Sequence, residues 1–167
     1  MNTQHRNASR AKRTPLPLVD PIRYAMASAR TFTPAQLAQL MAPNHAAVHA
    51  LQYGGFTADH WRVLADAFNI AEALAKPPVN IANDHAEKFD EAHCVLFALS
   101  EQYRDRRSWT ARAQQLQVIK DAMFIFQIQL ENVGQGEFER TVEKLKRRMV
   151  QALAGNGGNV RMVEAIS

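Results

Sequence analysis

The amino-acid sequence predicts an all-α protein, a bundle of five to six helices with a flexible N-terminal arm and a flexible C-terminal tail. Three observations lead to this prediction. Apolar residues recur at intervals of three and four along most of the chain, residues that favour helix starts precede these stretches, and glycine or proline separates them. With 167 residues, 47% hydrophobic and 22% charged, the chain is long enough for one domain with a buried core.

The ends of the chain differ in composition from its middle. Residues 1–14 are basic and polar without periodicity, which predicts a flexible arm, and residues 154–167 begin with Gly and Asn, which predicts a flexible tail. The helical domain is therefore expected at 15–153. Residues 1–30 carry six Arg or Lys against one Asp, whereas residues 31–100 carry three basic residues against seven acidic ones.

Three helices are expected in the first half of the domain. Asp20 followed by Pro21 is a typical helix start, and Thr33 followed by Pro34 repeats it. Pro43 is expected to end or kink the second of these helices. A helical piece that continues after Pro43 is expected to end at 54–55, where two glycines stand.

The next helix, capped by Thr57, ends before the prolines at 77–78. It has two neighbouring apolar stripes, so we expect it to lie at the centre of the bundle. The first stripe consists of Trp61, Leu64, Ala65, Phe68 and Ala71, and the second of Val63, Ala67, Ile70 and Leu74.

Three longer helices follow, at about 83–107, from the N-cap Thr110 to Asn132, and at about 137–153. Residues 124–130, "FIFQIQL", also alternate like a strand, but an apolar stripe that continues from Leu116 to Val133 favours a helix. The residues expected to face inward from the last helix are Phe138, Val142, Leu145, Met149 and Leu153.

Residues 36–55, "QLAQLMAPNHAAVHALQYGG", resemble the start of a DNA-binding helix-turn-helix. A recognition helix needs basic and amide side chains to bind phosphates and base edges, and this stretch has no Arg or Lys in an acidic part of the chain. Ordinary helix packing is therefore the favoured interpretation.

A metal site is the second alternative for the same stretch. His45 and His49 stand four residues apart, so both could bind zinc from one helix face. The metalloprotease pattern needs Glu where Ala46 stands, and Asp90 with His93 supplies only one of the two such units that a di-iron site needs. The weak candidates for a metal-dependent enzyme are thus His45 and His49, and we predict no cofactor.

No nucleophile motif or phosphate-binding loop occurs, so we predict that the protein is not an enzyme. Cys94 lies in the apolar run "CVLFAL", where we expect it to be a buried small hydrophobe. A single cysteine suits a reducing cytoplasm, and no segment has the apolar length that a membrane span needs.

The basic arm and the basic clusters at two helix ends raise the alternative of nucleic-acid binding. One cluster contains Arg104, Arg106 and Arg107, and the other contains Lys144, Arg147 and Arg148. Basic residues in the last turns of a helix also complement the helix dipole, and Arg147 is placed to pair with Glu143. The basic arm is the better candidate for binding nucleic acid.

Residues 59–75, "DHWRVLADAFNIAEALA", resemble a block found in uncharacterised short helical proteins encoded on bacterial plasmids and prophages. Residues 15–25, "PLPLVDPIRYA", are similar to the start of the same proteins, and the resemblance covers less than half of the chain. No activity is assigned to that family, so the resemblance implies a mobile genetic element rather than a mechanism. The matching residues are Trp61, Arg62, Leu64, Ala65, Asp66, Asn69, Ile70, Ala71, Glu72 and Leu74.

Four polar residues of this block, Arg62, Asp66, Asn69 and Glu72, form a strip on an otherwise apolar helix. Arg62 and Asp66 can pair across one turn, and the strip predicts either a buried polar network or a surface groove. Phe124, Ile125 and Ile128 lie off the main stripe of their helix and would form an exposed apolar patch. Together these features predict a non-catalytic accessory factor that binds a protein of a host or competing-element machine, with a second copy of the chain as another candidate partner.

Overall fold

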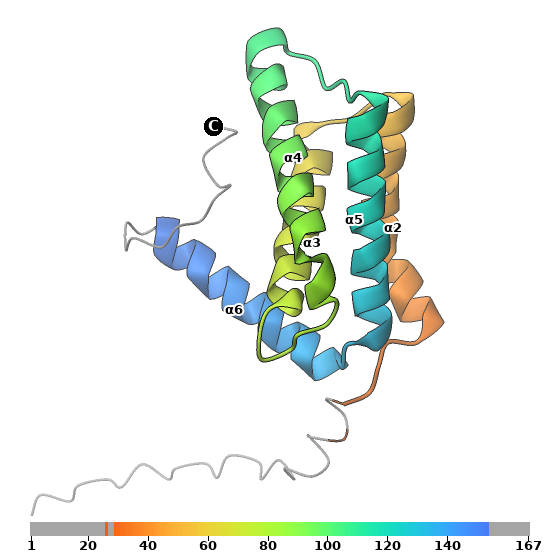
Figure 1. Ribbon diagram of the computed structural model, residues 1–167, viewed down its shortest axis with the longest axis vertical. Helices are drawn as coiled ribbons and strands as arrows, with labels where there is room; N and C mark the ends of the chain where they lie inside the picture. The colour runs from red at the N-terminus through yellow and green to blue at the C-terminus, as the bar shows by residue number, and fades with distance from the viewer. Residues whose placement is uncertain (1–25, 27–28, 154–167) are drawn as a thin grey trace, which may run out of the picture.

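The structure, a computed structural model, describes residue 26 and residues 29–153, and these residues form an all-α bundle (Figure 1). The elements in this part of the chain are α2 (Pro34–Tyr53), α3 (Ala58–Ala75), the short 3-10 helix η1 (Asn83–His85), α4 (Ala86–Arg106), α5 (Ala113–Asn132) and α6 (Gln135–Leu153). The predicted fold class is confirmed. The expected arm at 1–14, the tail at 154–167 and most of the helix expected after Asp20 lie outside the described residues.

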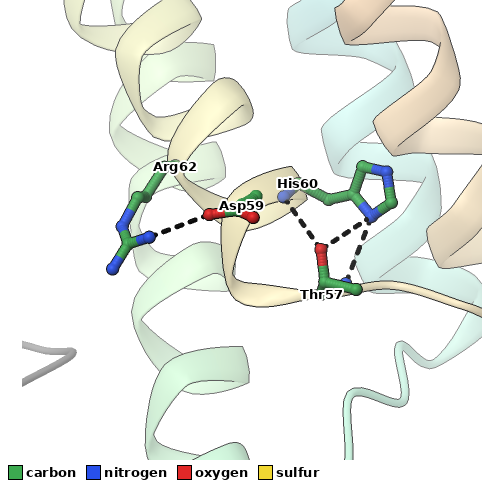
Figure 2. A network of polar contacts seen from close by, with 4 residues as sticks. All are labelled: Thr57, Asp59, His60 and Arg62. Carbon is green, nitrogen blue, oxygen red and sulfur yellow. Dashed lines mark hydrogen bonds and ion pairs between the residues drawn. The ribbon is translucent and has the colours of Figure 1, made fainter.

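Threonine caps start α2 and α3, as the sequence predicts. At α2, the backbone N–H of Gln36 donates to Thr33 Oγ1 at 3.3 Å, and Gln36 Oε1 accepts from the Thr33 N–H at 2.9 Å. At α3, the same exchange joins Thr57 to His60, whose ring nitrogen Nδ1 lies 3.2 Å from the Thr57 backbone nitrogen (Figure 2). The two caps satisfy helix N–H groups that would otherwise have no partner.

Of the two outcomes expected at Pro43, an end or a kink, the end is wrong, because α2 continues through it to Tyr53. Proline removes one N–H and leaves the carbonyl of the residue four positions earlier, Gln39, without its helical partner. Both Pro43 and Gln39 lie on the exposed side of α2, while Asn44 Nδ2 donates to the Leu40 carbonyl at 3.1 Å. The helix ends at Gly54, where φ is 102° and the N–H bonds to the Ala50 carbonyl at 2.9 Å.

α3 is the central helix and contacts α2, α4, α5 and α6. Its buried residues are Trp61, Leu64, Ala65, Ala67, Phe68, Ala71, Leu74 and Ala75. The Trp61 indole N–H donates to the Leu96 carbonyl of α4 at 2.8 Å within the core. The expected central position is therefore confirmed, and a buried hydrogen bond fixes the α3–α4 pair.

α4 and α5 form an antiparallel pair. The apolar stripe predicted from Leu116 to Val133 is buried except for the half-buried Leu116, and α4 buries Phe89, Ala92, Leu96 and Leu99 against it. The expected N-cap at Thr110 is wrong, because α5 begins at Ala113 after Arg112. Thr110 instead contacts Ser108 through the two hydroxyls, 3.0 Å apart, within the preceding loop. "FIFQIQL" is helical, as the continuous stripe predicts.

α6 differs from the other helices in its packing. In Figure 1 it leaves the lower end of the bundle at an angle to α2–α5, and its principal contacts are with α3. Its base is held by an edge contact between Phe138 and Phe32 at 5.4 Å and by a hydrogen bond from the Gln135 N–H to the Arg30 carbonyl at 2.8 Å. A bridge between Thr31 and Gly134 adds to this anchor.

The inward stripe expected on α6 is therefore only half-buried. This correction applies to Phe138, Val142, Leu145 and Met149, whereas the side chain of Leu153 lies outside the described residues. The bundle was expected to cover these residues, but the angle of α6 leaves one side of the stripe open. Among the described helices, none combines the length and hydropathy that crossing a bilayer requires.

Candidate binding groove

An open groove of about 610 Å³ lies between α6 on one side and α3 with the start of α4 on the other. It exists because α6 packs on α3 but diverges from α4. The residues that line it are Asp66, Asn69, Ile70, Glu72, Ala73, Lys76, Ala86, Asp90, Val142, Leu145, Lys146, Arg148 and Met149. Its volume is within the range of ligand-binding clefts in proteins.

The groove has apolar residues along its length and opposite charges on its two sides. Ile70 of α3 and Leu145 of α6 are among the half-buried apolar side chains. Asp66 and Asp90 supply negative charge from α3 and α4, and Arg148 supplies positive charge from α6. Among the described residues these three charged groups have no ion-pair partner, so the groove keeps unneutralised charges of both signs.

Asp66 and Asn69 confirm part of the predicted polar strip, because both line the groove. Asp66 is exposed overall, but partial desolvation of its carboxyl group at the groove wall raises its pKa above the ordinary value of 3.8. A cationic partner would stabilise the charged form of this carboxyl group, because pairing would offset the cost of its desolvation.

Glu72 also lines the groove, but the described contacts already use its carboxylate. One oxygen binds the Lys76 ammonium group, and the other lies 3.8 Å from His93 Nδ1 on α4. His93 is mostly buried and meets Phe68 edge-on at 6.3 Å. Glu72 therefore helps to join α3 to α4 at the wall of the groove.

Arg62 does not pair with Asp66, and the predicted pair is wrong. Its guanidinium group binds Asp59 at 2.9 Å, one turn toward the start of α3, as Figure 2 shows. Asp59 stands in the first helical turn, where a negative charge also complements the helix dipole. Arg62 is thus absent from the lining of the groove.

The basic cluster of α6 is divided between the groove and solvent. Arg148 lines both the groove and a second hollow on the surface of α6, whereas Lys144 and Arg147 border only that second hollow. The predicted pair between Glu143 and Arg147 is not formed, because Glu143 lies 3.5 Å from Lys146 instead.

The second basic cluster lies at the end of α4 beside a group of aromatic rings. Tyr103 stacks on Trp109 with ring centroids 4.4 Å apart, and the Arg107 guanidinium carbon lies 5.7 Å from the Tyr103 ring centroid. Arg104 binds Glu101, and Arg106 is exposed. The ring contacts hold the α4–α5 loop against the bundle, and the possible role of this cluster in binding nucleic acid stays a prediction.

The weak metal candidates are both exposed on α2. His49 contacts the Tyr53 ring at 4.6 Å, and no group of three or more His, Cys, Asp or Glu residues within the described part of the chain could hold a metal ion. His45 and His49 therefore lack further protein ligands there. Cys94 is exposed on α4, which corrects the expectation that it is buried.

The apolar patch expected on α5 is smaller than predicted. Phe124 is 65% exposed and Ile128 is exposed, but Ile125 is buried. One turn of α5 therefore presents two apolar side chains to solvent, without the hollow that α6 creates on the other surface.

Gln129 is the residue that the sequence analysis missed. It is fully buried on α5, and its amide nitrogen donates to the Ala71 carbonyl at 3.0 Å and to the Ile81 carbonyl at 2.8 Å. The signal was a polar residue within the buried stripe of Phe126, Leu130 and Val133. These bonds join α5 to the last turn but one of α3 and to the connection that follows α3.

Comparison with protein-family models, curated proteins and solved structures finds no match for this chain.

Proposed function

We propose that the protein is a non-catalytic protein-binding factor that holds an amphipathic helix of its partner in the groove between α6 and the α3–α4 pair. The observation that carries this proposal is the half-buried apolar stripe of α6, which α3 covers on one side only. Covering Leu145 or Met149 with a partner side chain would remove further apolar area from water, and full burial of such a side chain is worth about 1.5–3 kcal/mol. The geometry of helix and groove is a common mode of peptide recognition.

The charges of the groove specify the chemistry of that partner. Asp66 and Asp90 favour Lys or Arg on the flank of the partner helix that faces α3 and α4, and Arg148 favours Asp or Glu on the opposite flank. Such an arrangement selects orientation as well as partner, because a reversed helix would meet like charges. In the mobile-element context that the resemblance implies, we propose that the partner belongs to a host or competing-element machine.

Affinity capture from the native host tests the proposal with three tagged forms: wild type, Leu145→Asp and Phe124→Asp. Leu145→Asp places a charge in the apolar part of the groove, whereas Phe124→Asp makes the same kind of change on the exposed face of α5. We expect one partner to be retained by wild type and Phe124→Asp and lost with Leu145→Asp. Circular dichroism should first show equal helical content in all three forms.

A second measurement links the captured protein to the groove. A synthetic helix from that partner should bind purified wild type, and Asp66→Lys should weaken binding by about tenfold or more, equivalent to about 1.4 kcal/mol. Equal capture by wild type and Leu145→Asp, or loss with Phe124→Asp alone, would overturn the groove as the binding site.

A further inference from the structure

We infer that the groove also accepts α6 of a second copy of this chain, so that the protein forms a symmetric dimer through paired α6 helices. This inference rests on the proposed role of the groove as a docking site for an amphipathic helix. In a two-fold arrangement each α6 lies across the open side of the other copy's groove, and both grooves are covered by one interface.

α6 itself has the apolar pattern that the groove requires. Val142, Leu145 and Met149 recur at intervals of three and four, and all three are half-buried within one copy. Two such stripes packed together would cover each other's open side. The stripe of each copy would therefore line its own groove and also pack into the groove of the other copy, as an isologous interface requires.

The charges of α6 complement the opposite wall of the groove. Lys146 and Arg148 are exposed on α6 and line the groove beside its apolar stripe, and residues 135–153 hold five basic side chains against three acidic ones. The wall formed by α3 and α4 contributes Asp66 and Asp90, which have no ion-pair partner among the described residues. A second α6 brings its basic flank to this acidic wall.

One exposed apolar side chain extends the same surface. Phe97 is 51% exposed on α4, two turns beyond Asp90 on the same helix face. Seven residues of helix span about 10 Å, whereas the 19 residues of α6 span about 28 Å. One α6 is thus long enough to cover both the groove and the Phe97 region.

Sedimentation equilibrium of the full chain over a range of concentrations tests the dimer. We expect a reversible monomer–dimer equilibrium for wild type and for Phe124→Asp. Leu145→Asp should raise the dissociation constant at least tenfold while leaving the helical content unchanged. A wild-type protein that stays monomeric at every concentration overturns the inference, as does a dimer that only Phe124→Asp disrupts.

A charge-exchange experiment separates contact between copies from damage to one copy. One variant combines Asp66→Lys with Asp90→Lys, and the other combines Lys146→Glu with Arg148→Glu. Each variant alone faces like charges across the interface and should dissociate at least tenfold more readily than wild type. Their equimolar mixture restores opposite charges and should form a heterodimer, whereas a mixture that stays monomeric overturns the proposed pairing.

The outcomes also distinguish this inference from the proposed function. A monomeric wild type whose partner capture depends on Leu145 would refute the dimer and support the groove as a site for another protein. A dimer that depends on Leu145, without any captured partner, would support self-association and refute the accessory-factor role.

Discussion

Gln129 is a polar side chain in a position where the helical pattern requires an apolar one. Its two hydrogen bonds reach carbonyl groups on α3 and on the connection before η1, 58 and 48 residues away in sequence. Its Oε1 atom is buried without a hydrogen-bond partner among the described residues, which is a cost that the two donated bonds must exceed. We infer that Gln129, despite its buried unpaired oxygen, fixes the backbone of α3 and of the connection before η1 relative to α5.

Replacing Gln129 with Leu should lower the free energy of unfolding by about 1–3 kcal/mol, because the buried Ala71 carbonyl and the part-buried Ile81 carbonyl lose a donor. The connection at 76–85 should also become easier to cleave by protease, since Ile81 loses its tie to α5. Chemical denaturation and limited proteolysis measure the two effects. Gln117→Leu on the exposed face of α5 is the matched control, and it should change stability by no more than about 0.5 kcal/mol. Equal effects of the two substitutions would refute the role of Gln129.

The raised pKa of the Asp66 carboxyl group leads to a prediction about the pH dependence of stability. Its pKa is raised above 3.8 by desolvation, so the folded state binds the proton more tightly than the unfolded state. The associated stabilisation is present at low pH and is lost as pH rises through the raised pKa. The charged groups that share its groove are Glu72, Lys76, Asp90, Lys146 and Arg148.

Asp66→Asn should therefore raise the free energy of unfolding modestly at neutral pH, and this gain should disappear as pH falls below 3.8. Denaturation of dilute, monomeric protein at a series of pH values measures the difference. Asp59→Asn is the control of opposite sign, because it removes an ion pair with Arg62 and a favourable charge at the start of α3. A variant less stable than wild type at neutral pH would contradict the prediction.

At the scale of elements, α2 shows how a strong local signal is overridden. Proline disfavours a helix interior, yet α2 continues through Pro43, and Met41, Ala47 and Leu51 are buried on both sides of it. Burial of these side chains exceeds the cost of one missing hydrogen bond. The proline taken alone predicts an end or a kink, and the helix does not end there.

Pro43→Ala should increase the free energy of unfolding by about 1–3 kcal/mol, because alanine restores the N–H that the Gln39 carbonyl lacks. Greater freedom of the unfolded chain offsets part of this gain. Thermal and chemical unfolding measure it, with Ala46→Gly on the exposed face of α2 as a control that should destabilise by about 0.5–1 kcal/mol. A loss of stability in Pro43→Ala would mean that the ring makes packing contacts that alanine cannot replace.

α3 and α6 mark the limits of what the pattern of a single element can predict. The broad apolar surface of α3 correctly indicated a helix surrounded by others, because few arrangements can cover so much of one helix. The narrow stripe of α6 indicated only that one side prefers contact. It carried no information about the angle of packing, and that angle decides whether Leu145 is buried or lines a groove.

At the scale of the whole molecule, the all-α fold could be predicted because it depends on patterns within each helix. The candidate site could be predicted only in part. The strip at Asp66, Asn69 and Glu72 and the basic residue Arg148 were identified separately, but their approach in space depends on the orientation of α6. The sequence points to Asp90 only as a metal ligand, because its place at the groove follows from the packing of α4 beside α3.

The residues that enter the bundle from the N-terminal side are attached where α6 begins. The Arg30 carbonyl accepts the Gln135 N–H, and Thr31 forms a bridge with Gly134. Force applied to the chain before Arg30 would consequently act on these contacts at the start of α6 before it reached any other helix. Loss of the contacts at Arg30 and Thr31 would therefore alter the groove through the angle of α6, although neither residue lines the groove.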